Sequence, residues 1–160
     1  MKFIRKFYNK LKSFYFFYIK LIKNFYYKLR SFYFVIGGMR PWANGYGHYR
    51  ALTIKNQLCR QDFNPFSLPK GFGHRLDERV VEYPWFFSRL PSGEGKILDA
   101  GSVLNVDFVL SHSKLQSKKV FISTLAPESK NFTDSGVSYV YEDLRNSCFR
   151  DEYFDWIASL

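Results

Sequence analysis

The sequence predicts an α/β domain preceded by a long basic helix, and three observations support this prediction. Four short apolar segments after residue 95 have the length and composition of buried strands. Turns and helical patterns separate these segments, as expected for β-α units with a parallel sheet. The first 36 residues instead alternate apolar and cationic side chains with a helical period. With 160 residues and 46% hydrophobic content, the chain can bury a core of one-domain size.

Residues 1–36 form a strongly basic segment. They contain nine Lys and Arg residues and no Asp or Glu, so they supply +9 of the net charge of +10. At about 100° per residue, these cations fall within an arc of roughly 160°, and Phe, Tyr, Leu and Ile fill the opposite arc. The residues that break the pattern are Phe16, Phe17, Tyr27, Phe34 and Val35. We therefore expect a basic aromatic amphipathic helix over residues 1–36.

A helix with a cationic face and an aromatic face is typical of segments that bind an anionic membrane surface. Two other interpretations stay open: packing of the helix against the body or a partner, and nucleic-acid binding by base stacking. Nucleic acid is the least favoured, because no recognisable binding module is present. Lysines interrupt every apolar run before the roughly 18 residues needed to span a bilayer, and they also argue against a secretory signal. The expected location is cytoplasmic, peripheral to the inner face of the membrane.

Residues 37–76 are expected to form an irregular linker with one short helix. Glycine, proline and asparagine recur along this segment, and residues 48–59 have the pattern of the short helix. Cys59 and Cys148 lie far apart and neither has a second cysteine or histidine at metal-ligand spacing. We therefore expect reduced thiols, with neither a metal site nor a disulfide framework.

Residues 77–160 are expected to form the α/β domain. Helices are predicted over residues 77–90 and 105–115, and strands over residues 96–99, 119–125, 137–141 and 154–160. In open parallel sheets, ligands bind beyond the carboxyl ends of the strands. The first strand ends in Asp99-Ala100-Gly101-Ser102, where a glycine lets backbone approach a ligand and a helix N-terminus offers N–H donors. The third strand ends in Glu142-Asp143, and Asp143 either binds a ligand or caps the following turn.

Two segments of this domain resemble the class I S-adenosylmethionine-dependent methyltransferases, particularly the small-molecule branch called methyltransferase type 11. Residues 97–101, Ile-Leu-Asp-Ala-Gly, are similar to the start of its first motif, an apolar strand ending in acidic-x-Gly-x-Gly-x-Gly. Residues 141–155 resemble its Gly-Asp-Leu-x-x-Leu-Pro-Phe-x-Asp-x-Ser-Phe-Asp segment, with matching order and spacing. The resemblance covers about residues 77–160. It implies a partial Rossmann-like methyltransferase fold with about four parallel strands.

The resemblance also implies an S-adenosylmethionine site. Gly101 would border the methionine part, with Asp99 organising its turn, while Asp143 would accept the adenine amino group and Leu144 would pack on the ring. The expected cofactor-binding residues are Asp99, Ala100, Gly101, Ser102, Thr124, Asp143 and Leu144. The implied reaction is methyl transfer to a small-molecule or glycan-type acceptor, and the sequence identifies no catalytic residue.

The sequence departs from the family pattern in three ways. Val103 and Asn105 stand where the second and third glycines would be. Ser123 and Thr124 replace the acidic residue that holds the ribose hydroxyls, and Glu128 is the nearest carboxylate. The elements that hold the methyl acceptor follow the fourth strand in the family, so we expect most of the acceptor site to be missing.

These departures lead us to expect a truncated methyltransferase that is inactive alone, with an oligomer covering its exposed sheet edge. The alternative is a noncatalytic membrane-peripheral or interaction protein that retains half a cofactor-binding fold. A nicotinamide-binding unit is less favoured, because Gly-x-Gly-x-x-Gly does not follow the first strand and no acid ends the second.

Overall fold

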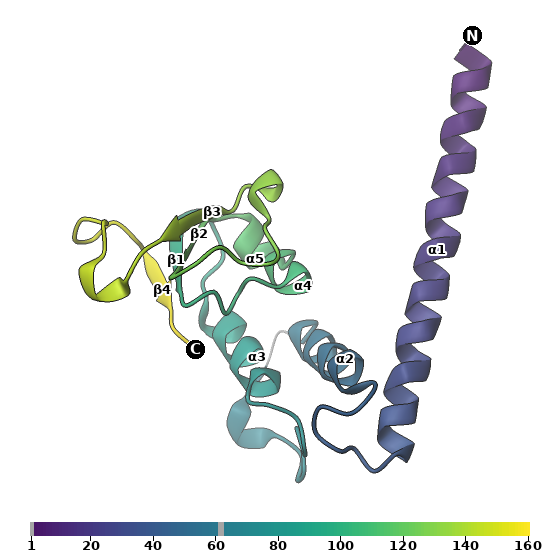
Figure 1. Cartoon of the computed structure of the whole chain (residues 1–160), viewed down its shortest axis with the longest axis horizontal. Coiled ribbons are helices and arrows are strands. Elements are labelled where there is room, and N and C mark those ends of the chain that lie inside the picture. The colour runs from purple at the N-terminus through teal and green to yellow at the C-terminus, as the bar shows by residue number, and fades with distance from the viewer. Residues whose placement is uncertain (1, 61–62) are drawn as a thin grey trace. The chain divides into compact units, whose positions relative to one another are not determined.

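The computed structural model describes residues 2–60 and 63–160, and the chain divides into two compact units. Met1–Asn56 and Pro69–Val80 form the first unit, and Gln57–Leu68 and Val81–Leu160 form the second. In chain order the elements are α1 (Lys2–Ile36), α2 (Tyr46–Leu58), η1 (Pro65–Ser67), α3 (Arg79–Arg89), β1 (Lys96–Ala100), α4 (Asp107–Leu110), α5 (Ser113–Gln116), β2 (Lys119–Thr124), η2 (Thr133–Ser135), β3 (Ser138–Tyr141), η3 (Leu144–Asn146) and β4 (Trp156–Ala158) (Figure 1).

Helix α1 is the predicted long N-terminal helix, and it runs without a break for 35 residues (Figure 1). Its sequence contains no glycine or proline, the two residues that most disfavour a helix interior. The helix ends where Gly38 adopts a φ of 81° and the amide of Met39 donates to the carbonyl of Phe34 over 3.0 Å. Within residues 2–60 and 63–160, no helix combines the length and apolarity that a membrane crossing requires.

The first unit is held together partly by Asp77, which connects residues 69–80 to α2. Its carboxylate accepts a hydrogen bond from Arg50 Nε at 2.8 Å, and its amide donates to the Tyr46 hydroxyl at 3.1 Å. The Tyr46 ring is buried, and this burial raises the pKa of its hydroxyl group. The hydroxyl therefore stays neutral and keeps its polar partner within the packed unit.

The second unit contains a four-stranded sheet in which every strand pair is parallel, as predicted. The strand order is β3-β2-β1-β4. Leu98 of β1 pairs with Phe121 of β2 on one side and with Ile157 of β4 on the other. The strand predicted over residues 154–160 is shorter in the structure, where β4 spans only Trp156–Ala158.

One face of the sheet carries the short helices. Ile97, Val120 and Ile122 are buried on it, and α5 packs against β2. The single helix predicted over residues 105–115 is wrong, because two one-turn helices, α4 and α5, replace it. His112 interrupts the run by adopting an extended backbone, and its Nδ1 accepts the amide of Lys114 at 3.3 Å.

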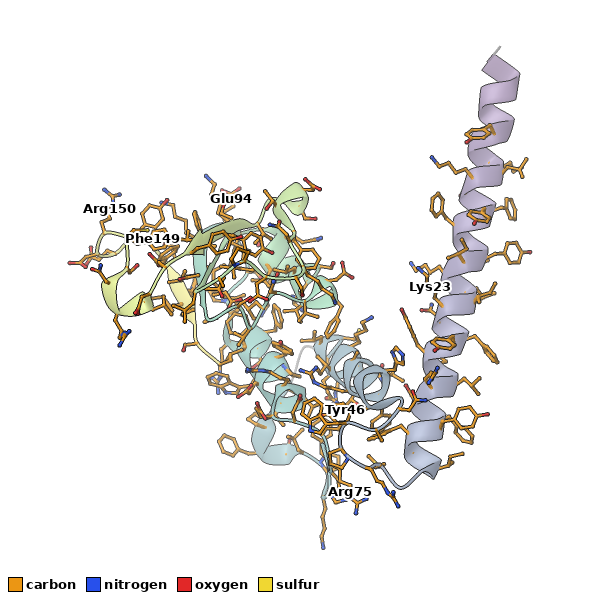
Figure 2. All side chains as sticks on the ribbon, viewed as in Figure 1. Lys23, Tyr46, Arg75, Glu94, Phe149 and Arg150 are labelled. Atoms are coloured by element: carbon orange, nitrogen blue, oxygen red, sulfur yellow. The ribbon has the colours of Figure 1, made fainter. Side chains whose placement is uncertain are left out.

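The opposite face of the sheet is partly covered by the loop between β3 and β4. Phe149 and Arg150 belong to this loop (Figure 2). The ring of Phe121 on β2 lies 5.9 Å from Phe149 and 5.4 Å from Phe154, while Phe149 and Tyr153 stack at 5.4 Å. These edge and stacked contacts take the place of a covering helix over this part of the sheet.

Candidate functional site

The turn after β1 is organised by the carboxylate of Asp99, which is completely buried. One oxygen accepts the amide of Val103 at 3.0 Å, and the other accepts the amide of Leu104 at 2.7 Å. Each carboxyl oxygen thus accepts one main-chain amide, which holds residues 103 and 104 next to the end of the strand. Asp99 therefore fixes the path of the chain as it leaves the carboxyl end of β1.

Gly101 and Ser102 form the tip of this turn, and both have positive φ angles, 116° and 64°. The Gly101 amide donates to the Ser123 carbonyl at 3.0 Å, and a Cβ built on Gly101 would meet no atom within 4 Å. The backbone at Gly101 is therefore exposed and open. The Ser102 hydroxyl is buried and has no hydrogen-bond partner in the part of the chain that the structure describes. A buried hydroxyl without a partner is costly, and a bound polar group would satisfy it.

Val103 and Asn105, which stand where the family motif has its second and third glycines, both form hydrogen bonds with other residues of the second unit. The carbonyl of Val103 accepts a hydrogen bond from the Tyr83 hydroxyl. Asn105 donates through Nδ2 to the Lys130 carbonyl at 3.1 Å, and its Oδ1 accepts the Tyr139 hydroxyl at 2.7 Å. Asn105 thus ties the turn to β3 and to the chain that precedes it.

Glu142 is the carboxylate that connects the ends of β2 and β3. It accepts the Ser123 hydroxyl at 3.2 Å, the Ser147 hydroxyl at 3.1 Å and the Cys148 amide at 2.8 Å. The hydrogen bond donated by the Cys148 amide is the main reason that the pKa of Glu142 lies below its ordinary value. Thr124, the last residue of β2, accepts the Glu142 amide through its carbonyl at 3.0 Å.

In the sequence pattern Glu142 is only one position of a motif, and the pattern favours its neighbour Asp143 as the ligand-binding residue. The strand alternation contained the missing signal, because Val140 pairs with the buried Ser123 and Glu142 continues the same face two residues later. A carboxylate in that position points at a serine that would otherwise be buried alone.

Asp143 caps the turn that follows β3. Its carboxylate accepts the Arg145 amide at 2.9 Å and forms an ion pair with the Arg145 guanidinium at 2.6 Å. The guanidinium lowers the pKa of this exposed carboxyl group. Of the two interpretations of Asp143, the cap describes its contacts in this structure. Leu144 follows it and is exposed.

Ala100 and Leu144 line a common cavity of about 590 Å³, which lies against β1, β4 and the loop between β3 and β4. Its walls include Leu98, Ile157 and Phe154. This volume lies within the usual range for small-molecule sites. The other five expected cofactor residues, Asp99, Gly101, Ser102, Thr124 and Asp143, are not among its lining residues. They lie instead along the carboxyl ends of β1, β2 and β3.

Across residues 2–60 and 63–160, no three His, Cys, Asp or Glu side chains gather in a way that could hold a metal ion. Comparison with known proteins returned no matching family model, no matching curated protein and no matching solved structure.

Proposed function

We propose that the second unit binds S-adenosylmethionine at the carboxyl edge of its sheet, as the cofactor-binding part of a truncated methyltransferase for a small-molecule or glycan-type acceptor that is inactive alone. The observation that carries this proposal is the turn after β1, in which buried Asp99 orders the chain next to the open backbone of Gly101. From β1 the chain adds β2 and β3 on one side and then returns to place β4 on the other side of β1. Such a topological switch point is where open α/β sheets bind ligands.

The proposed roles follow from the chemistry at each strand end. Gly101 lets the cofactor approach the main chain, and the Ser102 hydroxyl would bind its carboxylate or amino group. The adjoining cavity, with Ala100 and Leu144 in its wall, would take an apolar or aromatic part of the ligand. The cofactor supplies an electrophilic methyl group, so the protein mainly holds the two reactants in line.

A noncatalytic role is the second candidate, and two contacts favour it. Asp143, which would accept the adenine amino group, is paired with Arg145. Asn105, at the position of the third glycine, is engaged by Lys130 and Tyr139. A protein that had lost cofactor binding could keep the fold through such internal contacts.

Calorimetry of the full chain with S-adenosylhomocysteine tests the proposal, using Gly101→Val and Gly93→Val as a matched pair. Both glycines have positive φ angles, 116° and 104°, and both have open space where the new Cβ would lie. Gly93, however, precedes β1 and lies away from the carboxyl edge. We expect Gly101→Val to weaken binding by about tenfold or more, equivalent to about 1.4 kcal/mol, and Gly93→Val to leave it unchanged.

Two results would contradict the proposal. Binding that survives Gly101→Val, or that falls equally in both variants, would place the ligand away from this turn. Absence of binding by the wild-type chain would favour the noncatalytic candidate.

A further inference from the structure

Helix α1 contacts α2 mainly through its polar side, and Leu21 and Phe25 of the apolar side line the margin of a cavity shared with α2. Tyr27 stacks on His48 with ring centroids 4.6 Å apart. Phe34 is only 2% exposed and packs against the rings of Tyr46 at 5.8 Å and Tyr49 at 5.4 Å. Tyr27 and Phe34 are two of the aromatic residues that interrupt the cationic face. Their spacing of seven residues puts them on one side of the helix, where they form the contact with α2.

The backbone of Gly45 fixes this contact. It has a φ of 90°, and a Cβ at this position would collide with the carbonyl oxygen of Arg30. Ser31 is buried on the same side of α1 and donates its hydroxyl to the Tyr27 carbonyl at 2.8 Å. The position of α2 on α1 is therefore specified on the polar side of the helix.

The apolar side of α1 stays exposed along most of its length. Rings project from the helix over many turns (Figure 2). The exposed apolar residues of this side are Tyr8, Leu11, Phe14, Tyr15, Tyr18, Leu21, Ile22, Phe25, Tyr26, Leu29, Phe32, Tyr33 and Ile36. Soluble proteins rarely expose a continuous apolar stripe of this kind unless it has a binding partner.

The charges indicate which partner fits. Neither α1 nor α2 contains an Asp or Glu residue, and Lys10, Lys12, Lys23 and Lys28 lie along the edges of the apolar stripe. A second copy of α1 would bring these like charges together without an acid to pair them. Nucleic acid would pair with the lysines but would leave most of the apolar stripe in water. An anionic bilayer matches both, because its acyl chains cover the rings and its headgroups meet the lysines.

We propose that the apolar face of α1 lies on an anionic lipid bilayer surface while α2 stays packed on the opposite side of the helix. The long lysine side chains extend along the edges of the stripe toward the headgroups. Tyrosine rings suit the interfacial depth, because each combines an apolar body with a polar hydroxyl.

Co-sedimentation of the full chain with vesicles tests this proposal. The vesicles contain phosphatidylcholine alone or phosphatidylcholine with one quarter phosphatidylglycerol. Phe14→Asn and Phe17→Asn form a matched pair, because the two rings are 55% and 62% exposed but only Phe14 is on the apolar face. Lys12→Gln with Lys23→Gln tests the charges. Far-UV circular dichroism confirms that each variant keeps its helix.

We expect binding to the anionic vesicles that weakens with added salt and is at least about tenfold weaker on phosphatidylcholine alone. Phe14→Asn should weaken it about tenfold, since it removes one buried ring. The double lysine variant should weaken it by a similar factor, and Phe17→Asn should leave it unchanged.

Three outcomes would overturn the proposal. The first is failure of the wild-type chain to bind anionic vesicles. The second is binding that depends on the lysines but not on Phe14, which would indicate a general polyanion site such as one for nucleic acid. The third is self-association in the absence of vesicles that Phe14→Asn abolishes, which would assign the stripe to a second copy of the chain.

Discussion

The aromatic side chains of α1 and those of the β3–β4 loop differ in what covers them. In the loop, the ring centroids of Phe149, Tyr153 and Phe154 lie within 5.4 Å of one another, and the rings pack against Phe121 of the sheet. Where both rings belong to α1, the pairs are sequence neighbours such as Tyr15 and Phe16, and both members are exposed. The comparison shows that aromatic content alone does not define a core, since the same residue types cover a sheet in one unit and face outward in the other.

The charged groups differ in the same way. In the second unit, Asp99, Glu142 and Asp143 each bind groups within their own unit. In α1, nine cations occur with no acidic residue in the helix. These three carboxylates of the second unit therefore find partners within the unit, while α1 has the composition of a surface that meets an external anion.

The sharpest test within α1 compares Phe34→Ala with Phe32→Ala. Phe34 is 2% exposed and Phe32 is 59% exposed, although they lie two residues apart. Loss of the buried ring should cost about 3–5 kcal/mol, whereas loss of the exposed ring should change stability by less than about 0.5 kcal/mol. Hydrogen exchange of the α2 amides measures both. Equal loss of protection in the two variants would mean that α1 does not pack on α2 through its polar side.

A comparable test in the second unit replaces Asp99 with alanine. The Val103 and Leu104 amides would lose their acceptor in a buried site, which should cost about 2–3 kcal/mol. Asp143→Ala is the control, because that carboxylate is exposed and caps a single turn. Hydrogen exchange of the β1 and β2 amides should rise in the first variant and stay near wild type in the second. A larger effect of Asp143→Ala would reverse the assignment of the organising carboxylate.

The sequence predicted the elements with strong local signals. The 3.6-residue period of α1 and the compact apolar runs of the four strands are visible without tertiary information. The break at His112 was missed because residues 105–115 have a continuous helical pattern. Only the extended backbone of His112, with its side chain capping α5, shows where the run divides.

The candidate site was predictable at Asp99 and Gly101, because an acidic residue and a glycine at the end of a buried strand indicate a ligand-binding turn without any tertiary information. Glu142 was not chosen over its neighbour, since that choice depends on which face of β3 meets Ser123. The role of Asn105 was also hidden. Its partners, Tyr139 and the Lys130 carbonyl, lie far along the chain and are brought together only by the fold.

The smallest expected effect is a pH dependence that should affect the second unit and spare α1. The hydrogen bond from the Cys148 amide lowers the pKa of Glu142 below its ordinary value of 4.5. A carboxylate whose pKa is lower in the folded state stabilises the fold above the unfolded pKa, and this contribution is lost as pH falls through the folded value. Helix α1 contains no carboxylate that could titrate in the same range.

Urea denaturation of wild type and Glu142→Gln at pH 6.5 and pH 4.0 measures this effect. Acidification should destabilise wild type more than the variant, by less than about 1 kcal/mol because the carboxylate is partly exposed to solvent. The protection of the α1 amides from hydrogen exchange, corrected for the intrinsic pH dependence of exchange, should not change between pH 6.5 and pH 4.0. Identical pH responses of wild type and variant would show that Glu142 does not connect the ends of β2 and β3. A pH response confined to α1 would contradict the proposed difference between α1 and the second unit, because α1 contains no acidic residue that could titrate.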